Sequence, residues 1–166
     1  MDLSLQEIFD APKTIPVPHE WTELNDRLMW ISPLDIGGAT ISGLRIRIRT
    51  IKTEPERNVT VALEYVPVGR ECGLDRIDWR PFHNHTNRGL GPPEHQFKII
   101  STSHRHEFGW NLKGGGVSMR KGNLPIAIPI ENEPVNFQEL LDFVAKTYNI
   151  AALEDLRPPD WEAVLI

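Results

Sequence analysis

The clearest structural signal in the sequence is TISGLRIRIRTI, residues 40–51. Within it, Leu44, Ile46 and Ile48 alternate with three arginines. Because successive side chains of a strand point to opposite faces, this period of two predicts a β-strand with one apolar face and one basic face. The next apolar run, Val59–Tyr65, alternates in the same way after a polar segment. The two runs are therefore expected to form an antiparallel hairpin.

The basic face of the predicted strand carries Arg45, Arg47 and Arg49. In the hairpin, Glu64 is expected to lie among them on the neighbouring strand. An arginine stripe suits phosphate, because each guanidinium presents a fork of donors. The simpler interpretation is a solvated outer face, since charge alternates on any strand that is buried on one side only. The sequence alone favours the simpler interpretation.

Two helices are predicted from their capping residues. Ser4 with Glu7 has the spacing of a capping box, which indicates a short first helix that ends by Pro12. Asn136 begins a longer helix, which ends at Asn149, a residue that tolerates the left-handed conformation. The longer helix carries an apolar face at helical spacing.

Together these elements predict an α+β fold in a single domain, residues 1–166. A mainly antiparallel sheet of about five to seven strands is covered on one face by the C-terminal helix, Asn136–Asn149. The segment Arg70–Gly91 is expected to be a long functional loop, because it is rich in turn-forming residues. The remaining strands are expected to be short or at edges: Leu28–Ile31, Gln96–Ser101, His104–Trp110, Val117–Arg120 and Leu124–Ile130.

Composition excludes several classes of protein. The longest strongly apolar stretch, Leu124–Ile130, is far shorter than the roughly 20 residues that cross a bilayer, so no membrane association is expected. The first residues do not resemble a secretory signal, and Cys72 is the only cysteine, which together predict a cytoplasmic protein without disulfides. The net charge of −5 argues against a generally basic surface for nucleic acid but allows a local one.

The side chains best suited to proton transfer are concentrated in one segment. Five of the six histidines lie between residues 83 and 106, and histidine is the side chain best suited to exchange protons near neutral pH. His83 and His85 are separated by one residue, as are His104 and His106, so on extended chain each pair points to one side. If folding brings the pairs together, the imidazoles converge, and Asp78 can join or orient them.

Two kinds of chemistry fit such a cluster. In the first, three or more imidazoles hold a transition metal. In the second, which the sequence favours, no metal or other cofactor binds. His83 or His85 then deprotonates a ribose hydroxyl, and His104 or His106 protonates the leaving oxygen. Asp78 orients an imidazole, and the phosphate is bound by a set of polar residues from the same segment: Arg76, Arg80, Asn87, Arg88 and Arg105.

The same segment resembles small bacterial families that include the TumE-type toxins of toxin–antitoxin operons. The resemblance is carried by Arg76-Ile77-Asp78, His85-Thr86-Asn87, Gly91-Pro92-Pro93-Glu94-His95 and His104-x-His106. It implies a small α+β protein that cleaves or binds RNA, with an antitoxin as a protein partner.

Two alternatives remain open at this stage. A non-catalytic module could use the same histidines and arginines to bind a protein or a nucleic acid, and a metal-dependent enzyme could use them as ligands. The distances among the imidazoles discriminate between these possibilities. Nitrogens within about 4 Å of one another across a shared site favour a metal. A cleft of about 5 to 8 Å favours acid–base catalysis, and diverging rings favour the interaction module.

Overall fold

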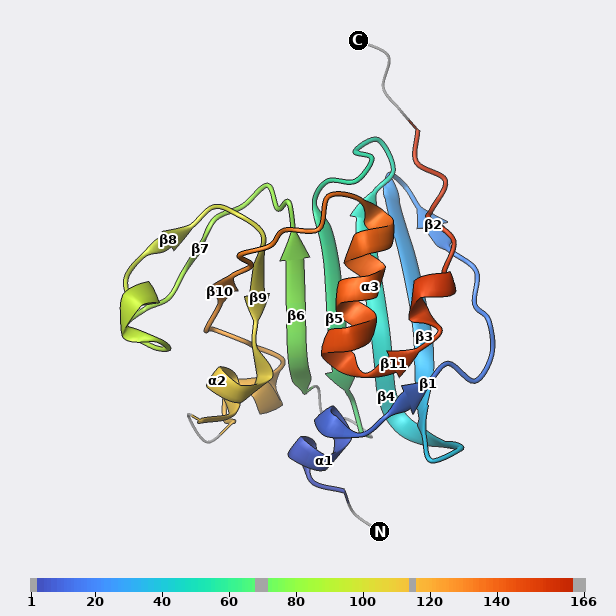
Figure 1. The fold of residues 1–166 in the computed structure, drawn as a ribbon, viewed down its shortest axis with the longest axis horizontal. Coiled ribbons are helices and arrows are strands. Elements are labelled where there is room, and N and C mark those ends of the chain that lie inside the picture. The colour runs from blue at the N-terminus through green and yellow to red at the C-terminus, as the bar shows by residue number, and fades with distance from the viewer. Residues whose placement is uncertain (1–2, 68–71, 114–115, 163–166) are drawn as a thin grey trace.

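The computed structural model describes residues 3–67, 72–113 and 116–162. Within these residues a sheet of nine strands runs through the molecule in the order β10-β9-β6-β5-β4-β3-β1-β11, and β2 pairs with β3 (Figure 1). Every pairing in it is antiparallel except that between β1 and β11. Its strands are β1 (Lys13–Thr14), β2 (Thr22–Leu24), β3 (Arg27–Ile36), β4 (Ala39–Ile51), β5 (Val59–Tyr65), β6 (Gly73–Trp79), β9 (His104–His106), β10 (Ile128–Pro129) and β11 (Ile150–Ala151).

The predicted hairpin forms the centre of this sheet. In β4 and β5, Ile46 lies opposite Leu63 and Arg45 lies opposite Glu64. Leu44, Ile46 and Ile48 are fully buried, whereas the arginines between them lie on the other face. The alternation in the sequence therefore predicts both the strand and its two faces correctly.

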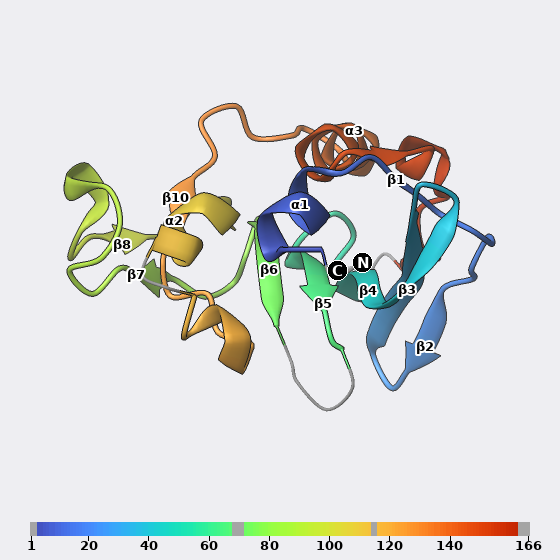
Figure 2. The ribbon, with the colours of Figure 1, turned by 90° about the horizontal axis from the view of Figure 1, so that it is seen from below.

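Helix α3 (Phe137–Tyr148) covers one face of the sheet, together with α1 (Leu5–Asp10), as Figure 2 shows from below. Both capping predictions are confirmed. Ser4 and Glu7 form a capping box, the Asn136 side chain accepts a hydrogen bond from the backbone of Glu139, and Asn149 ends α3 with a φ of 52°. The apolar side of α3 packs into the core against the buried faces of β3 to β6. Neither α1 nor α3 lies on the opposite face of the sheet, which is called the uncovered face below.

Between β6 and β9 the chain leaves the sheet and forms an arm at the far end of the molecule (Figure 1). The arm contains the two-stranded sheet of β7 (His85–Thr86) and β8 (Ile99–Ile100), with the short 3-10 helix η1 (Pro93–His95) between them. Helix α2 (Phe108–Lys113) and a second 3-10 helix, η2 (Met119–Lys121), follow β9, and η3 (Leu153–Asp155) follows β11.

The structure corrects three expectations about the strands. The sheet has nine strands among the described residues rather than five to seven. The expected loop contains β6, a central strand, because the inward-pointing Asp75 breaks the apolar alternation that would have revealed it. Regions expected to be strands are partly helical, since α2 begins at Phe108 and η2 spans Met119–Lys121.

Two further points concern the whole described chain. The α+β class and the C-terminal helix packed on one face of a mainly antiparallel sheet are as the sequence predicts. No helix among the described residues has the length and apolar character needed to cross a bilayer.

Candidate functional site

Three imidazoles meet at the junction of the sheet and the arm. The ring centroids of His85 and His106 are 4.6 Å apart, those of His104 and His106 are 5.2 Å apart, and those of His85 and His104 are 5.7 Å apart. The rings come from β7 and β9, which are not paired with each other. The sequence raised this convergence only as a possibility, for segments that are neighbours in a sheet. Three of the four imidazoles of the two pairs do meet, although the two segments are not paired.

Strand pairing explains which side chains join them. In the antiparallel pair of β6 and β9, Asp78 lies opposite His104 and Arg76 lies opposite His106. Residues directly opposite each other in a sheet present their side chains on the same face. All four therefore project from the face of the sheet that α3 does not cover, whereas Arg105, between the two histidines, projects toward α3.

Asp78 is the hub of this cluster. Its Oδ2 lies 3.3 Å from His104 Nε2, 3.2 Å from His106 Nε2 and 3.0 Å from Arg76 Nε. Its Oδ1 accepts a hydrogen bond of 3.0 Å from the Thr60 hydroxyl on β5. Burial opposes ionisation of this carboxyl, but its contacts with both imidazoles and the charge of Arg76 outweigh it and hold the pKa of Asp78 well below its usual range.

The far nitrogens of both histidines are held by the backbone. His104 Nδ1 lies 2.8 Å from the carbonyl oxygen of Thr102, and His106 Nδ1 lies 2.5 Å from that of Leu124. A carbonyl only accepts, so each Nδ1 is the protonated nitrogen. In the neutral ring this leaves a lone pair on Nε2, and in both residues Nε2 is the atom that faces Asp78.

His104 and His106 are almost entirely buried, with 2% and 1% of their surface exposed. Burial lowers the pKa of His106 to about 4, and the neighbouring charge of Arg76 acts in the same direction. His106 is therefore neutral near pH 7, which agrees with its contact to Arg76, whose Nη2 lies 2.7 Å from His106 Nε2. The guanidinium donates to the lone pair of the neutral ring.

His85 is oriented by the arm and by the segment before β10. Its Nε2 donates to Asn87 Oδ1 at 3.0 Å and to the carbonyl oxygen of Pro125 at 2.9 Å. Asn87 is fully buried and is itself fixed by the backbone N–H and C=O of Ala127. Burial lowers the pKa of His85, so its Nδ1 is free of a proton near neutral pH.

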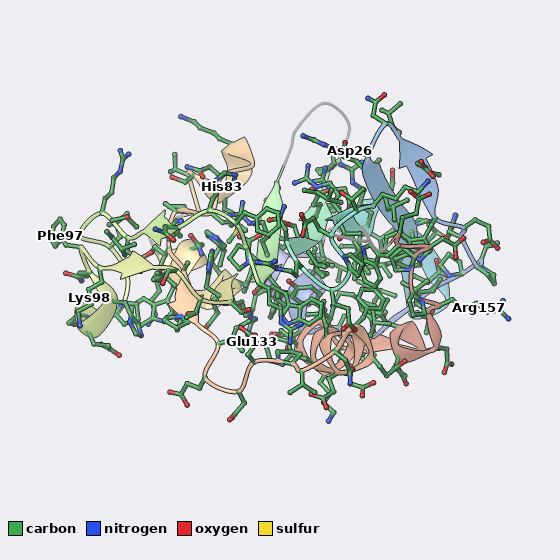
Figure 3. All side chains as sticks on the ribbon, turned by 90° about the horizontal axis from the view of Figure 1, so that it is seen from above. Asp26, His83, Phe97, Lys98, Glu133 and Arg157 are labelled. Atoms are coloured by element: carbon green, nitrogen blue, oxygen red, sulfur yellow. The ribbon has the colours of Figure 1, made fainter. Side chains whose placement is uncertain are left out.

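The cluster opens into a cavity of about 220 Å³ on the uncovered face of the sheet. In Figure 3, His83 and Asp26 lie on this side of the sheet, whereas Glu133 lies on the side of α3. The side chains that line the cavity come from β5 and the residue before it, from β6 and β9, and from the start of the arm: Asn58, Thr60, Arg76, Asp78, Pro81, His83, Asn84, His85 and His104.

A second cavity lies beside the first on the same face of the sheet. It has a volume of about 380 Å³, shares Asn58 and Thr60 with the first, and is also lined by Arg27, Arg47 and Arg49. The arginines of β4 thus lie beside the histidine cluster on one surface, a relation that the sequence did not predict.

These arginines have few acidic partners. Glu64 pairs with Arg45 at 2.7 Å and also with Arg47, as the sequence predicted. Arg47 Nε is buried and has no hydrogen-bond partner among the described residues. Burial and the positive charge of Arg47 lower the pKa of Arg49. The surface is therefore locally basic although the chain carries a net charge of −5.

Two residues expected to bind phosphate have structural contacts elsewhere. Arg80 stacks on Trp79 and bonds to Glu133 and to two backbone carbonyls, which anchors the segment before α3. Arg105 forms a bidentate ion pair with the buried Asp75 on the α3 side of the sheet, with Nε bonded to Oδ1 and Nη2 to Oδ2.

Arg88 and Asn87 also differ from the expectation. Arg88 lines a separate cavity on the arm, next to His85, and Asn87 positions His85 from a buried place. Of the expected phosphate ligands, only Arg76 lies in the cluster itself.

Sequence reasoning missed Thr60, Asn58 and the backbone acceptors of the two β9 histidines. Thr60 of β5 lies opposite Asp78 of β6. Its place in the cluster can therefore be predicted only when β6 is recognised as a strand. The carbonyl oxygens of Thr102 and Leu124 belong to the backbone, so no side-chain pattern in the sequence predicts that they bind the two histidines. Within the described residues, Asp78, His104 and His106 are the group that could hold a metal, because their ligand atoms all lie within 4.8 Å of one another.

Comparisons with protein-family models, with curated proteins and with solved structures gave no match, so the assignment of a role rests on the geometry described above.

Proposed function

We propose that the protein cleaves phosphodiester bonds in RNA on the uncovered face of the sheet. The observation that carries the proposal is the adjacency of two cavities that share Asn58 and Thr60, one lined by histidines and Asp78 and the other by arginines. Arginine forks bind phosphate oxygens, and adjacent imidazoles transfer protons at neutral pH. A polyanion bound along the arginines would present one of its phosphates to the histidines.

In this proposal His83 and His85 carry out the two proton transfers of the cleavage reaction. The sequence placed the proton donor on His104 or His106, but both rings are buried and their Nδ1 atoms are bonded to the backbone. His83 is exposed and lines the cavity, and His85 presents an Nδ1 without a proton. His85 is therefore the base in this proposal and His83 the acid.

The reaction follows from these positions. His85 Nδ1 takes the proton of the ribose 2′-hydroxyl, whose oxygen attacks phosphorus, while the bond from phosphorus to the 5′-oxygen breaks and that oxygen takes a proton from His83. The products are a 2′,3′-cyclic phosphate and a free 5′-hydroxyl. Arg76 is placed to stabilise charge on the non-bridging oxygens. An RNA substrate agrees with the resemblance to TumE-type toxins and with a cytoplasmic location, in which the buried free Cys72 remains reduced.

The test is cleavage of a labelled single-stranded RNA by the wild type and by His85→Ala. Loss of a general base costs about 100-fold to 10,000-fold in rate. His95→Ala is the matched control, because His95 lies on the same arm but does not line the cavity. Replacing the 2′-hydroxyl at the cleaved position by hydrogen must abolish the reaction.

Two results would contradict the proposal. Equal rates for the wild type and His85→Ala would remove His85 from the reaction. Binding of RNA without any cleavage would instead support a non-catalytic interaction module on the same surface. Because phosphate contacts release counterions, such binding would weaken steeply with salt.

A further inference from the structure

The geometry points to a binding site for one divalent transition-metal ion, formed by Asp78, His104 and His106. This inference goes beyond the proposed function and does not depend on it. The sequence favoured chemistry without a metal, because only the His-x-His spacing suggested ligands. The folded chain adds a carboxylate from the neighbouring strand, at the place where both imidazoles point.

The separations of the donor atoms already approach those around an ion. A tetrahedron with bonds of about 2.0 to 2.1 Å to the metal has edges of about 3.3 to 3.4 Å. The distances from Asp78 Oδ2 to the two Nε2 atoms are 3.2 and 3.3 Å. All three ligand atoms lie within 4.8 Å of one another, so small rotations of the side chains complete the site.

The orientation of the rings is the second step. Histidines that bind a metal usually donate their other N–H to a carbonyl or carboxylate, which fixes the ring and directs the lone pair to the ion. His104 and His106 both do so, through the carbonyls of Thr102 and Leu124. In both residues Nε2 is therefore the nitrogen turned toward the Asp78 carboxylate, at 3.3 Å for His104 and 3.2 Å for His106.

Arg76 places its own positive charge against these atoms in the ion-free protein. Its Nε lies 3.0 Å from Asp78 Oδ2 and its Nη2 lies 2.7 Å from His106 Nε2, so the guanidinium bonds to two of the three ligand atoms. The side chain is 37% exposed and lines the cavity, which gives it room to turn away when an ion binds. Arg76 and the ion therefore compete for the same atoms.

The donor set selects the class of ion. Two imidazoles and one carboxylate suit zinc, iron, manganese or cobalt, whereas magnesium and calcium prefer oxygen ligands alone. Three protein ligands leave at least one coordination position, on the side of the cavity. There the ion would polarise an oxygen of a bound anion, and the displaced Arg76 would lie next to the same anion.

The test is isothermal titration of the full chain, stripped of metals and free of chelator, with Zn²⁺, and with Co²⁺ as a spectroscopic probe. We expect one ion per chain. Asp78→Asn and His104→Ala should each weaken binding by about 100-fold, and His95→Ala should leave it unchanged. Arg76→Met should bind the ion more tightly than the wild type, because it removes the competing cation. Circular dichroism establishes that each variant is folded.

Several outcomes would overturn the inference. One is the absence of binding at about 100 µM Zn²⁺, and another is equal affinity for the wild type, Asp78→Asn and His104→Ala. Weaker binding by Arg76→Met would also contradict it, since competition requires the opposite. The titration contains no RNA, so failure of RNA cleavage leaves this inference intact. Full RNA cleavage by a protein that binds no ion would refute the metal site and keep the proposed function.

Discussion

Replacing Asp75 by asparagine should destabilise the protein more than any comparable change near the site. Asp75 is fully buried in β6 on the α3 side of the sheet. Its carboxylate accepts three hydrogen bonds from Arg105, two from Nε at 3.0 Å and one from Nη2 at 2.7 Å. It also accepts one of 2.9 Å from the backbone N–H of Phe108 and one of 3.0 Å from the Tyr148 hydroxyl. One side chain thus connects β6, β9, α2 and α3.

The magnitude follows from what the substitution leaves behind. Asparagine keeps the shape but removes the charge, so the largely buried guanidinium of Arg105 loses its partner, at a cost of about 3 to 5 kcal/mol. Both oxygens of Asp75 accept hydrogen bonds, so the NH₂ group of asparagine would face a donor in place of the oxygen that accepted from it. Tyr148→Phe, in contrast, removes one hydrogen bond to a charged group and should cost only about 1.5 to 3 kcal/mol.

Urea unfolding followed by circular dichroism measures both effects. With a slope of about 2 kcal/mol per molar urea, Asp75→Asn should lower the midpoint by about 1.5 to 2.5 M. Asp142→Asn, on the exposed side of α3, is the control and should change the free energy of unfolding by less than about 0.5 kcal/mol. Because Arg105 lies between His104 and His106, the same substitution should also weaken metal binding.

A midpoint shift of less than about 0.5 M for Asp75→Asn would refute this reasoning. Burial raises the pKa of Asp75, against the hydrogen bonds and charge of Arg105, and a small shift would mean that the carboxyl is neutral in the folded protein. Asp75→Asn with Arg105→Met gives a second test. If the unpaired charge is the main cost, the double variant should be more stable than Asp75→Asn alone.

Three further predictions concern other parts of the fold. Burial lowers the pKa of Lys13 to about 8, although its ammonium donates to three backbone carbonyls. Between about pH 8 and 10.5 the unfolded chain therefore binds a proton at Lys13 that the folded chain has lost. The free energy of unfolding should therefore rise with pH in this window relative to Lys13→Met, by at most about 3 kcal/mol, and a fall in urea titrations would contradict it. Gly43→Ala should destabilise strongly in thermal unfolding, because φ is +82° and the added Cβ would lie 2.2 Å from the carbonyl oxygen of Val66. Asn87→Ala should release His85 and lower RNA cleavage while the midpoint of unfolding by urea falls by no more than about 1.5 M, and an unchanged rate would count against the role of the arm.

The parts of the fold that follow from local patterns could be predicted, and those that depend on distant partners could not. The alternation in β4 and the cap of α3 at Asn136 depend only on residues that are close together in the sequence. β6 was missed because Asp75 points into the core, where Arg105 compensates its charge from a strand about 30 residues away. No local pattern reveals such compensation.

The site shows the same division. The gathering of histidines between residues 83 and 106 indicated the right segment. The role of Asp78 as the hub depended on strand register, since it lies opposite His104 only in the antiparallel pair of β6 and β9. The burial of His104 and His106 and the proximity of the β4 arginines arise from the curvature and order of the whole sheet, which the sequence does not specify locally.

The arm between Trp79 and His104 begins and ends on neighbouring strands of one antiparallel pair. Its two ends are therefore held a single strand spacing apart, whatever the length of chain between them. The entropic cost of closing a loop grows only with the logarithm of its length. Insertions in the arm would therefore leave the main sheet folded. The length and sequence of the arm can therefore vary while the residues at its base, next to the histidine cluster, stay in register.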